Sequence, residues 1–293
     1  MSLKEFCRFA KYHAIGNDYL VIEPGWLPLP PANLIQRLCH RNFGAGSDGI
    51  LYGPLESKVA EYQLRIFNPD GSEAEKSGNG LRIFCRHMFD SGLVSLNTPF
   101  HVETKGGIVR CSVHDEGRTV IVEMGRATFD SREIPVVGDV REVLQESIAV
   151  GSHTFSYCAV SVGNPHCVIV LPEISEALAK EAGPLLERHA LFPNRTNVQF
   201  LKVLDRHHIQ IEIWERGAGY TLSSGSSSSA CAAVAVRLDL CDSPVTVHMP
   251  GGDLAIDVNG DFGIRMSGPV TAVASGSIWQ EAVQDLLGAN LEG

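Results

Sequence analysis

One structural unit occurs twice in this chain of 293 residues, and the repetition limits the possible folds more than any other feature. The first copy is a strand, a turn of small residues at 77–80 (SGNG) and a largely apolar helix. The second copy has the same pattern around the turn 224–227 (SGSS), 147 residues later. A repeat at this separation indicates gene duplication and predicts two similar lobes that face each other.

Helical spacing of apolar residues predicts four helices, at 33–40, 80–89, 174–189 and 230–238. Asn33 is a candidate N-cap of the first. The second has a narrow apolar face, so we expect Arg82 and Arg86 to lie near an edge. The fourth is apolar on nearly every side, which predicts that it is buried inside a curled sheet.

Between these helices the sequence predicts many short strands. Alternating residues from 100 to 122 are typical of antiparallel strands. Further strands are expected at 9–13, 19–22, 50–52, 62–67, 155–162, 167–171, 198–203, 209–214, 245–249, 254–258 and 263–266. The residues 68–71 (NPDG) are expected to form a turn.

Composition narrows the class of protein. Hydrophobic residues make up 44% of the chain, enough for a sizeable core. The formal charge of -10 argues against nucleic acid or an anionic membrane as a partner. No apolar run approaches the roughly 20 residues that span a bilayer, and residues 1–20 have no secretion-signal pattern. We therefore expect a cytoplasmic protein that acts on a small molecule.

The eight cysteines show no C-x-x-C spacing and are expected to be reduced and mostly buried. A structural metal site would need clustered ligands, whereas the pairs 39–40 (CH) and 166–167 (HC) are merely adjacent. The sequence therefore predicts no metal.

Residues 44–49 (GAGSDG) match the G-x-G-x-x-G dinucleotide fingerprint. That fingerprint should follow a strand and open a helix, but here it follows a helical segment and precedes a strand. We interpret it as a glycine-rich loop that turns the chain beside another surface.

The candidate binding site consists of the N-termini of the helices predicted at 80–89 and 230–238, each of which follows a turn of small residues. A helix N-terminus offers free N–H groups and partial positive charge, which bind carboxylates. A serine at one such position would ordinarily be only an N-cap. Each of the two helix N-termini is also preceded by polar residues that N-capping does not require. Asn68 precedes the first N-terminus, and Glu215 and Arg216 precede the second.

A set of motifs carries a resemblance to a known family. In chain order they are 11–19 (KYHAIGNDY), 46–49 (GSDG), 65–72 (RIFNPDGS), 77–80 (SGNG), 163–167 (GNPHC), Asn197 and 215–219 (ERGAG). In order and spacing this set, which covers nearly the whole chain, resembles the diaminopimelate epimerases.

The resemblance implies an α/β (α+β) fold of two pseudo-symmetric lobes, each a curled, mostly antiparallel sheet around a central helix. The lobes are expected at 1–124, joined by 274–293, and at 125–273. The family's activity is a cofactor-independent epimerisation, LL- to meso-diaminopimelate, in lysine and cell-wall precursor biosynthesis. The resemblance leaves open whether the chain forms a homodimer.

The resemblance also implies the site residues, carried over by position. Those that would bind the reacting carboxylate are Gly78, Asn79, Gly225 and Ser226. Those that would hold the rest of the amino acid are Asn17, Asn68, Asn164, Asn197, Glu215 and Arg216.

The family's two catalytic cysteines correspond to Ser77 and Ser224 in this chain. A cysteine thiol titrates near 8.5, whereas a serine hydroxyl is a much weaker acid and needs an activating base. No His or Lys adjoins either serine in sequence except Lys76. The loop 222–229 (LSSGSSSS) departs from the family along its length, which favours natural divergence over replacement at one position.

Three functions remain open on this basis. The first is a diaminopimelate epimerase-like isomerase with Ser77 and Ser224 at the proton-transfer positions. The second is a racemase of another amino acid, or an isomerase or dehydratase that works through serine. The third is a non-catalytic protein that binds an amino acid.

Overall fold

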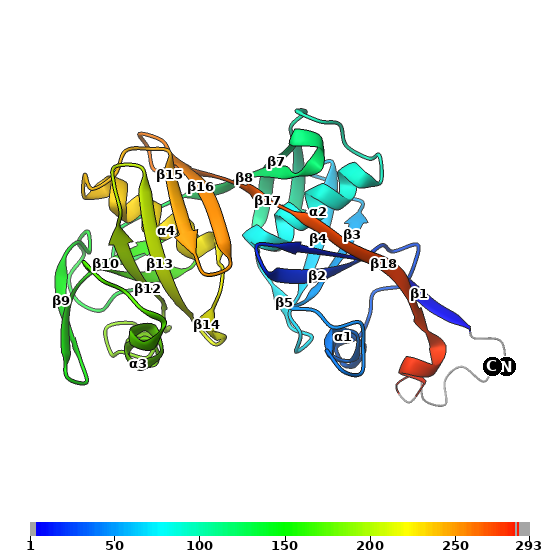
Figure 1. The fold of residues 1–293 in the computed structure, drawn as a ribbon, viewed down its shortest axis with the longest axis horizontal. Coiled ribbons are helices and arrows are strands. Elements are labelled where there is room, and N and C mark those ends of the chain that lie inside the picture. Colours follow the sequence, from blue (N-terminus) through cyan, green and yellow to red (C-terminus); the bar gives the residue numbers. More distant parts are fainter. Residues whose placement is uncertain (1–3, 285, 287–293) are drawn as a thin grey trace. The chain divides into compact units, whose positions relative to one another are not determined.

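The computed structural model describes residues 4–284 and 286, and the chain separates into two compact units (Figure 1). Unit 1 comprises residues 1–122 and 269–293, and unit 2 comprises residues 123–268. None of the helices in the described residues is both long and apolar enough to span a membrane.

Unit 1 contains one sheet and two α-helices. Its strands are β1 (Glu5–Ala14), β2 (Asn17–Ile22), β3 (Ile50–Leu55), β4 (Tyr62–Phe67), β5 (Glu73–Ala74), β6 (Phe100–Thr104), β7 (Gly107–His114), the first half of β8 (Thr119–Arg126), and β18 (Thr271–Trp279). Its helices are α1 (Ala32–Cys39), α2 (Gly78–Asp90) and the short 3-10 turns η1 (Asp115–Gly117) and η2 (Gln280–Val283).

Unit 2 is built from the following elements. Its strands are β9 (Glu146–Val150), β10 (His153–Ser161), β11 (Pro165–Val170), β12 (Asn197–Val203), β13 (His208–Glu215), β14 (Gly219–Thr221), β15 (Val245–Met249), β16 (Gly252–Val258) and β17 (Gly263–Pro269). Its helices are α3 (Glu176–Glu187) and α4 (Gly225–Arg237).

The two units share one topology. In unit 1 the pairing runs β18-β1-β2-β3-β4-β6-β7-β8, and only β2–β3 and β4–β6 are parallel. In unit 2 it runs β9-β10-β11-β12-β13-β15-β16-β17, and only β11–β12 and β13–β15 are parallel. Each parallel pair is joined through a helix, as parallel strands require. The predicted mostly antiparallel α/β fold is therefore confirmed.

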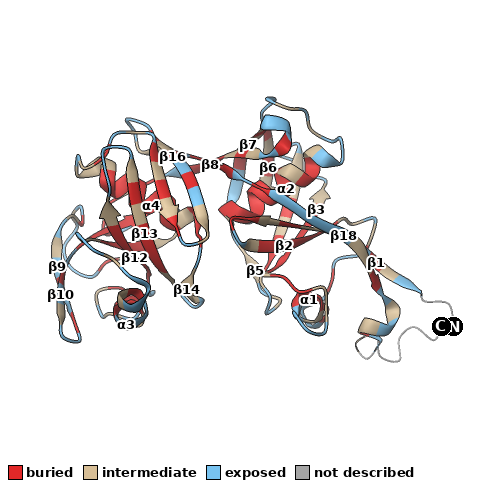
Figure 2. Cartoon of the chain, in the orientation of Figure 1, coloured by how far each residue is buried: buried red, intermediate tan, exposed pale blue. Residues whose placement is uncertain are grey.

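Each sheet has one helix on each face. α2 contacts β1, β2, β3 and β7, and α4 contacts strands from β10 to β16, so each lies within the curve of its own sheet. The opposite faces bury α1 and α3 in separate clusters, α1 against residues such as Leu20 and Ile50 and α3 against Phe155 and Phe200. α4 is buried along nearly its whole length, as its sequence predicts (Figure 2).

Three local predictions are wrong. The N-cap of α1 is Pro31, and Asn33 lies inside the helix, where its Oδ1 accepts from the N–H of Leu34 at 2.9 Å. Arg82 is completely buried and does not lie at an edge, because the sheet of unit 1 curls around that side of α2 as well. α4 begins at Gly225, five residues before the predicted start.

The sequence patterns did not predict the strands β9, β14 and β18. The exposed run 271–275 at the start of β18 has no alternation of buried and exposed residues that a period-2 pattern could detect. β18 nevertheless pairs with β1 along most of its length.

Candidate active site

Ser77 caps the N-terminus of α2. Its Oγ accepts from the N–H of Gly80 at 3.0 Å, and the hydroxyl of Tyr19 lies 3.4 Å from the same oxygen. Residues 78–80 are buried. A Cβ at Gly80 would approach Ser77 Oγ to 3.2 Å and Leu51 Cδ2 to 3.0 Å, so glycine keeps room around the hydroxyl.

Ser224 caps α4 in the equivalent position of unit 2. Its Oγ accepts from the N–H of Ser227 at 3.3 Å, and the Oγ of Ser226 lies 3.4 Å away. The serine run after it is helical, and Ser228 and Ser229 donate to the carbonyls of Ser224 and Gly225, both at 2.8 Å. These bonds to the carbonyl four residues back satisfy the buried hydroxyls, so the run can be buried inside the helix without unpaired hydroxyls at these two positions.

A polar network reaches the start of α2 from β2. Asn79 Nδ2 donates to Asn17 Oδ1 at 3.1 Å, and Asn17 Nδ2 donates to Asp48 Oδ2 at 2.9 Å. Arg82 Nη2 donates to Asn79 Oδ1 at 2.6 Å. The structure therefore brings together two of the sequence-predicted residues, Asn17 and Asn79, beside Ser77.

The glycine-rich loop 44–49 supports this network. It lies between α1 and β3, and it supplies Asp48. A Cβ at Gly49 would lie 2.4 Å from the carbonyl oxygen of Phe67 and 2.6 Å from the ring of Tyr19. The glycine thus permits close packing, in agreement with a loop that turns beside another surface.

Asn68 has local partners only. It lies just after β4, in a turn where the N–H of Gly71 donates to its carbonyl at 2.9 Å. Its Nδ2 donates to Ser72 Oγ at 3.0 Å. The predicted turn is confirmed, and the hydrogen bonds of Asn68 to the described residues stay within this turn, away from Ser77 and Asn79.

In unit 2 the predicted asparagines, Asn164 and Asn197, form hydrogen bonds near the ends of neighbouring strands. Asn197 Nδ2 donates to the carbonyl of Pro165 at 2.9 Å, and its Oδ1 accepts from the N–H of Arg216 at 3.0 Å. Asn164 Oδ1 lies 2.9 Å from Nε2 of His166. The guanidinium of Arg216 is exposed and donates from Nη1 to the carbonyl of Asn194 at 3.1 Å.

Glu215 contacts the capping serine of its own unit. Burial raises the pKa of the Glu215 carboxyl, and a hydrogen bond from the Ser224 side chain opposes that rise. The Ser224 hydroxyl therefore has a carboxyl oxygen within hydrogen-bond reach. The sequence gives no sign of this contact because nine residues separate the two.

His166 and Gln199 are buried polar residues that the sequence analysis did not select. Gln199 Nε2 donates to Ser227 Oγ at 3.0 Å, next to the start of α4. Burial lowers the pKa of His166 to about 3, so its ring is neutral at physiological pH. Both residues lie within apolar, strand-forming stretches of the sequence, and such stretches predict ordinary core positions.

Known proteins match this sequence along most of its length. The family model for diaminopimelate epimerase matches residues 9–130 and 158–273. The chain is 60% identical over 276 residues to diaminopimelate epimerase 2 of Nostoc sp. (strain PCC 7120), covering 94% of this chain and 96% of that protein. This chain belongs to the diaminopimelate epimerase family.

A second relative and two solved structures also match the chain over most of its length. The diaminopimelate epimerase of Moorella thermoacetica is 39% identical over 278 residues, covering 92% of this chain and 98% of that protein. Among solved structures, a hydroxyproline epimerase from Agrobacterium vitis matches with a TM-score of 0.71 at 14% identity, covering 96% and 93% of the two chains. Methylitaconate-delta-isomerase matches with a TM-score of 0.67 at 11% identity, covering 98% of each. The likenesses to solved structures show the fold alone.

The two helix starts carry serine, and the cysteines lie elsewhere. All eight are free and buried, as expected from their spacing. Burial raises the pKa of Cys85, Cys167 and Cys231 above that of an ordinary thiol. Within the described residues, no three His, Cys, Asp or Glu side chains gather as metal ligands.

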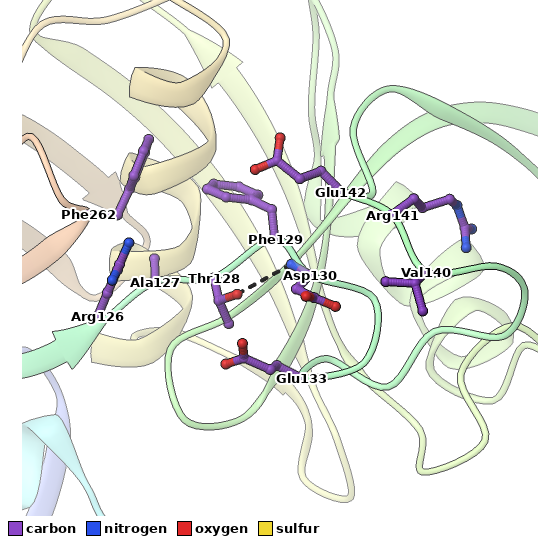
Figure 3. A pocket seen from close by; sticks show the side chains of 10 residues that line it. All are labelled: Arg126, Ala127, Thr128, Phe129, Asp130, Glu133, Val140, Arg141, Glu142 and Phe262. Carbon is purple, nitrogen blue, oxygen red and sulfur yellow. Dashed lines mark hydrogen bonds between the residues drawn. The ribbon is translucent and has the colours of Figure 1, made fainter.

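A pocket of about 500 Å³ lies in another part of unit 2 (Figure 3). It is lined by Arg126, Ala127, Thr128, Phe129, Asp130, Glu133, Val140, Arg141, Glu142 and Phe262. Two of its charged groups form ion pairs: Glu142 pairs with Arg237, and Arg141 pairs with Glu146. None of the sequence-predicted site residues lines it.

Proposed function

We propose that this protein epimerises diaminopimelate between its LL and meso forms, with Ser77 and Ser224 as the two groups that move the α-proton. One observation carries the proposal. The two serines cap topologically equivalent helices in two units of the same strand order, and each Oγ accepts the N–H three residues ahead. Membership of the family supplies the substrate class, an amino acid.

The start of each helix supports binding of the reacting carboxylate. The first N–H groups of a helix have no intrahelical acceptor, and the helix dipole favours negative charge there. In α2 these groups belong to Gly78 and Asn79, and in α4 to Gly225 and Ser226. When a base removes the α-proton, the electron pair moves into the carboxylate, so donors placed there stabilise the transition state.

The distal amino-acid group of diaminopimelate needs partners of both signs. Arg216 can bind a carboxylate through two parallel hydrogen bonds, and Asn197 orients its backbone. We assign six residues to the hold on the substrate, namely Asn17, Asn68, Asn164, Asn197, Glu215 and Arg216, with Asn68, Asn197, Glu215 and Arg216 at its distal end. Diaminopimelate carries an ammonium group at that end, for which Glu215 is the acidic partner.

Hydroxyls replace thiols in the proton transfer. In one direction a serine oxygen takes the α-proton as the C–H bond breaks, and the other serine gives its proton to the opposite face of the carbon. The Ser224–Glu215 contact gives the Ser224 hydroxyl an acceptor for its hydrogen bond, which favours the protonated form of Ser224 as the group that donates to the carbon. The free, buried cysteines also suit a reducing compartment, and we place the enzyme in the cytoplasm.

Single alanine substitutions test the two-serine assignment. Each stereoisomer should be followed by proton NMR in deuterated water, with wild type, Ser77→Ala and Ser224→Ala. We expect each variant to lose interconversion, while one isomer still exchanges its α-proton through the remaining serine. The two variants should differ in which isomer exchanges. Interconversion at the wild-type rate in either variant would contradict the proposal.

A further inference from the structure

Arg82 of α2 is a buried cation without a counter-ion among the described residues. Its side chain is completely buried, and Nη2 makes the single bond to Asn79 Oδ1. Nε and Nη1 have no hydrogen-bond partner among the residues that the structure describes. Burial lowers the pKa of Arg82 to about 9, which leaves the guanidinium charged at neutral pH. An unpaired buried charge is costly, so such a group needs an explanation.

The charge of Arg82 lies under the first turn of its helix. Arg82 follows Ser77 by five residues, which is about 7.5 Å of rise along a helix. Helical side chains lean toward the N-terminus, and the bond from Arg82 to Asn79 follows that direction. The guanidinium therefore adds a full positive charge to the partial charge that the helix already places there.

The equivalent position in α4 is neutral. Counted from Ser224, the residue that corresponds to Arg82 is Ser229, whose Oγ donates to the carbonyl of Gly225. The charged neighbour of Ser224 is instead an acid, Glu215. A carboxylate beside a hydroxyl disfavours a second negative charge on it.

Other titratable groups on the elements packed against α2 have their own partners. Asp18 of β2 pairs with Lys11 of β1 and with Arg41, and Tyr12 donates to Asp90. On α2 itself, Arg86 pairs with Asp90, and His87 lies beside Glu23.

Further titratable groups lie next to Ser77 or on the other elements packed against α2, namely β2, β3, β7 and η1. Tyr19 can donate to Ser77, and Tyr52 of β3 donates to the carbonyl of Leu27. Lys76 adjoins Ser77 in the chain, and burial lowers its pKa while Cys111 of β7 opposes that shift. On η1, Glu116 pairs with Arg118, and Asp115 gives its carbonyl to Arg118. None of these is an acid paired with Arg82.

We propose that Arg82 is a positioning residue that makes Ser77, rather than Ser224, the hydroxyl that ionises more readily. The inference rests on the proposed function and adds a direction to it. Ser77 loses its O–H proton to water, and its oxygen then takes the α-proton, forming a new O–H bond as the C–H bond breaks. Ser224 gives its proton to the opposite face and regains one from water, which restores both hydroxyls.

Cysteine thiols introduced at positions 77 and 224 report the local electrostatic potential through their pKa values, and no substrate is needed. Ser77→Cys and Ser224→Cys are made separately, and the pH midpoint of each thiol is read from its thiolate ultraviolet absorbance after subtraction of wild type. The native cysteines are all buried, which keeps the background low. We expect the thiol at position 77 to ionise at a pH lower than the thiol at 224.

Substitution of Arg82 tests whether its charge causes the difference between the two thiol pKa values. Arg82→Met in the Ser77→Cys protein should raise the thiol pKa by about one unit, as for a unit charge several ångströms away at an effective dielectric near 20. Arg82→Lys should retain part of the effect. The same Arg82→Met change should shift the thiol at position 224 less than the thiol at position 77. Arg86→Met is the matched control, because Arg86 lies on the same helix but is paired with Asp90.

Two results would overturn the inference: equal midpoints at positions 77 and 224, or an unmoved midpoint at 77 in a folded Arg82→Met protein. If Arg82→Met does not fold, Asn79→Asp gives Arg82 a counter-ion and should raise the same midpoint, whereas an unmoved midpoint there would also overturn it. Failure of the epimerase proposal would be recognised separately, as absence of α-proton exchange in a protein whose thiol midpoints behave as stated.

Discussion

At the scale of single residues, Ser77 and Ser224 combine two roles that substitutions can separate. Each satisfies a free N–H at a helix start, and each is assigned a proton transfer. Ser77→Ala should lower the free energy of unfolding by about 1 kcal/mol, the usual cost of a lost N-cap. Ser77→Asn should keep the stability, because asparagine caps as well as serine, but it should abolish interconversion. Denaturant unfolding and the isomer assay, run on both variants, check the separation.

His166 should make stability depend on pH. Its pKa is about 3 in the folded protein, against an ordinary value of 6.5 when the chain is unfolded, so between these values the unfolded chain binds more protons. Stability is therefore fully present above pH 6.5 and is lost as the pH falls toward 3. The loss between pH 7 and pH 5 should be about 2 kcal/mol.

His166→Gln checks this assignment by urea unfolding at both pH values. The variant should lose most of the difference between pH 7 and pH 5. The matched control is His207→Gln, since His207 is exposed. An equal pH dependence in wild type and His166→Gln would show that other groups cause the acid sensitivity.

The sequence could locate the serines but not the groups that act on them. A serine before a glycine and an apolar run is a local signal. The burial of Arg82, the contact of Tyr19 with Ser77 and that of Glu215 with Ser224 depend on how distant strands come together. No periodicity within one segment contains that information.

At the scale of elements, the glycine-rich loop 44–49 has a packing role that can be measured. Gly49→Ala would place a Cβ 2.4 Å from the carbonyl oxygen of Phe67, so the loop or β4 must shift. We expect a loss of roughly 1–3 kcal/mol in unfolding free energy, typical of overpacking. Gly25→Ala is the control, because nothing lies within 4 Å of its Cβ position. Equal stabilities of the two variants would contradict the packing role.

The start of α4 illustrates why element boundaries were harder to predict than element types. A run of glycine and serine favours a turn by local preference. In the folded chain the buried serines bond the carbonyls of the preceding turn, so the run is helical. Tertiary burial outweighs local propensity here, because the hydroxyls have no water to bond instead.

At the scale of the whole molecule, the duplicated pattern was the most informative part of the sequence. It predicted two similar lobes, and both units do have the same strand order and the same parallel pairs. The family resemblance implied that residues 274–293 join the first lobe, but no local pattern indicated that β18 pairs with β1. Pairing between segments so far apart leaves no local mark.

Ligand binding should stabilise the folded chain if the substrate assignment is correct. At a hundredfold excess over Kd, meso-diaminopimelate should add about 2.7 kcal/mol to the free energy of unfolding. Lysine, which lacks the distal carboxylate, should stabilise less. Arg216→Gln should reduce the effect of diaminopimelate with little change in the unliganded protein, because the guanidinium is exposed and makes one backbone hydrogen bond. Equal stabilisation by lysine and diaminopimelate would argue against a hold on the distal end.

The most direct test of the serine epimerase is the conversion of LL-diaminopimelate in deuterated water, with the product separated by stereoisomer and its α-deuterium measured. Wild type should form meso product labelled at the α-carbon, and Ser77→Cys/Ser224→Cys should form it at least about a hundredfold faster, because thiols are better proton-transfer groups. We expect labelled meso product from wild type and none from Ser77→Ala/Ser224→Ala. No conversion by wild type together with rapid conversion by Ser77→Cys/Ser224→Cys would show that the hydroxyls do not move the proton, and the serine mechanism would then be wrong.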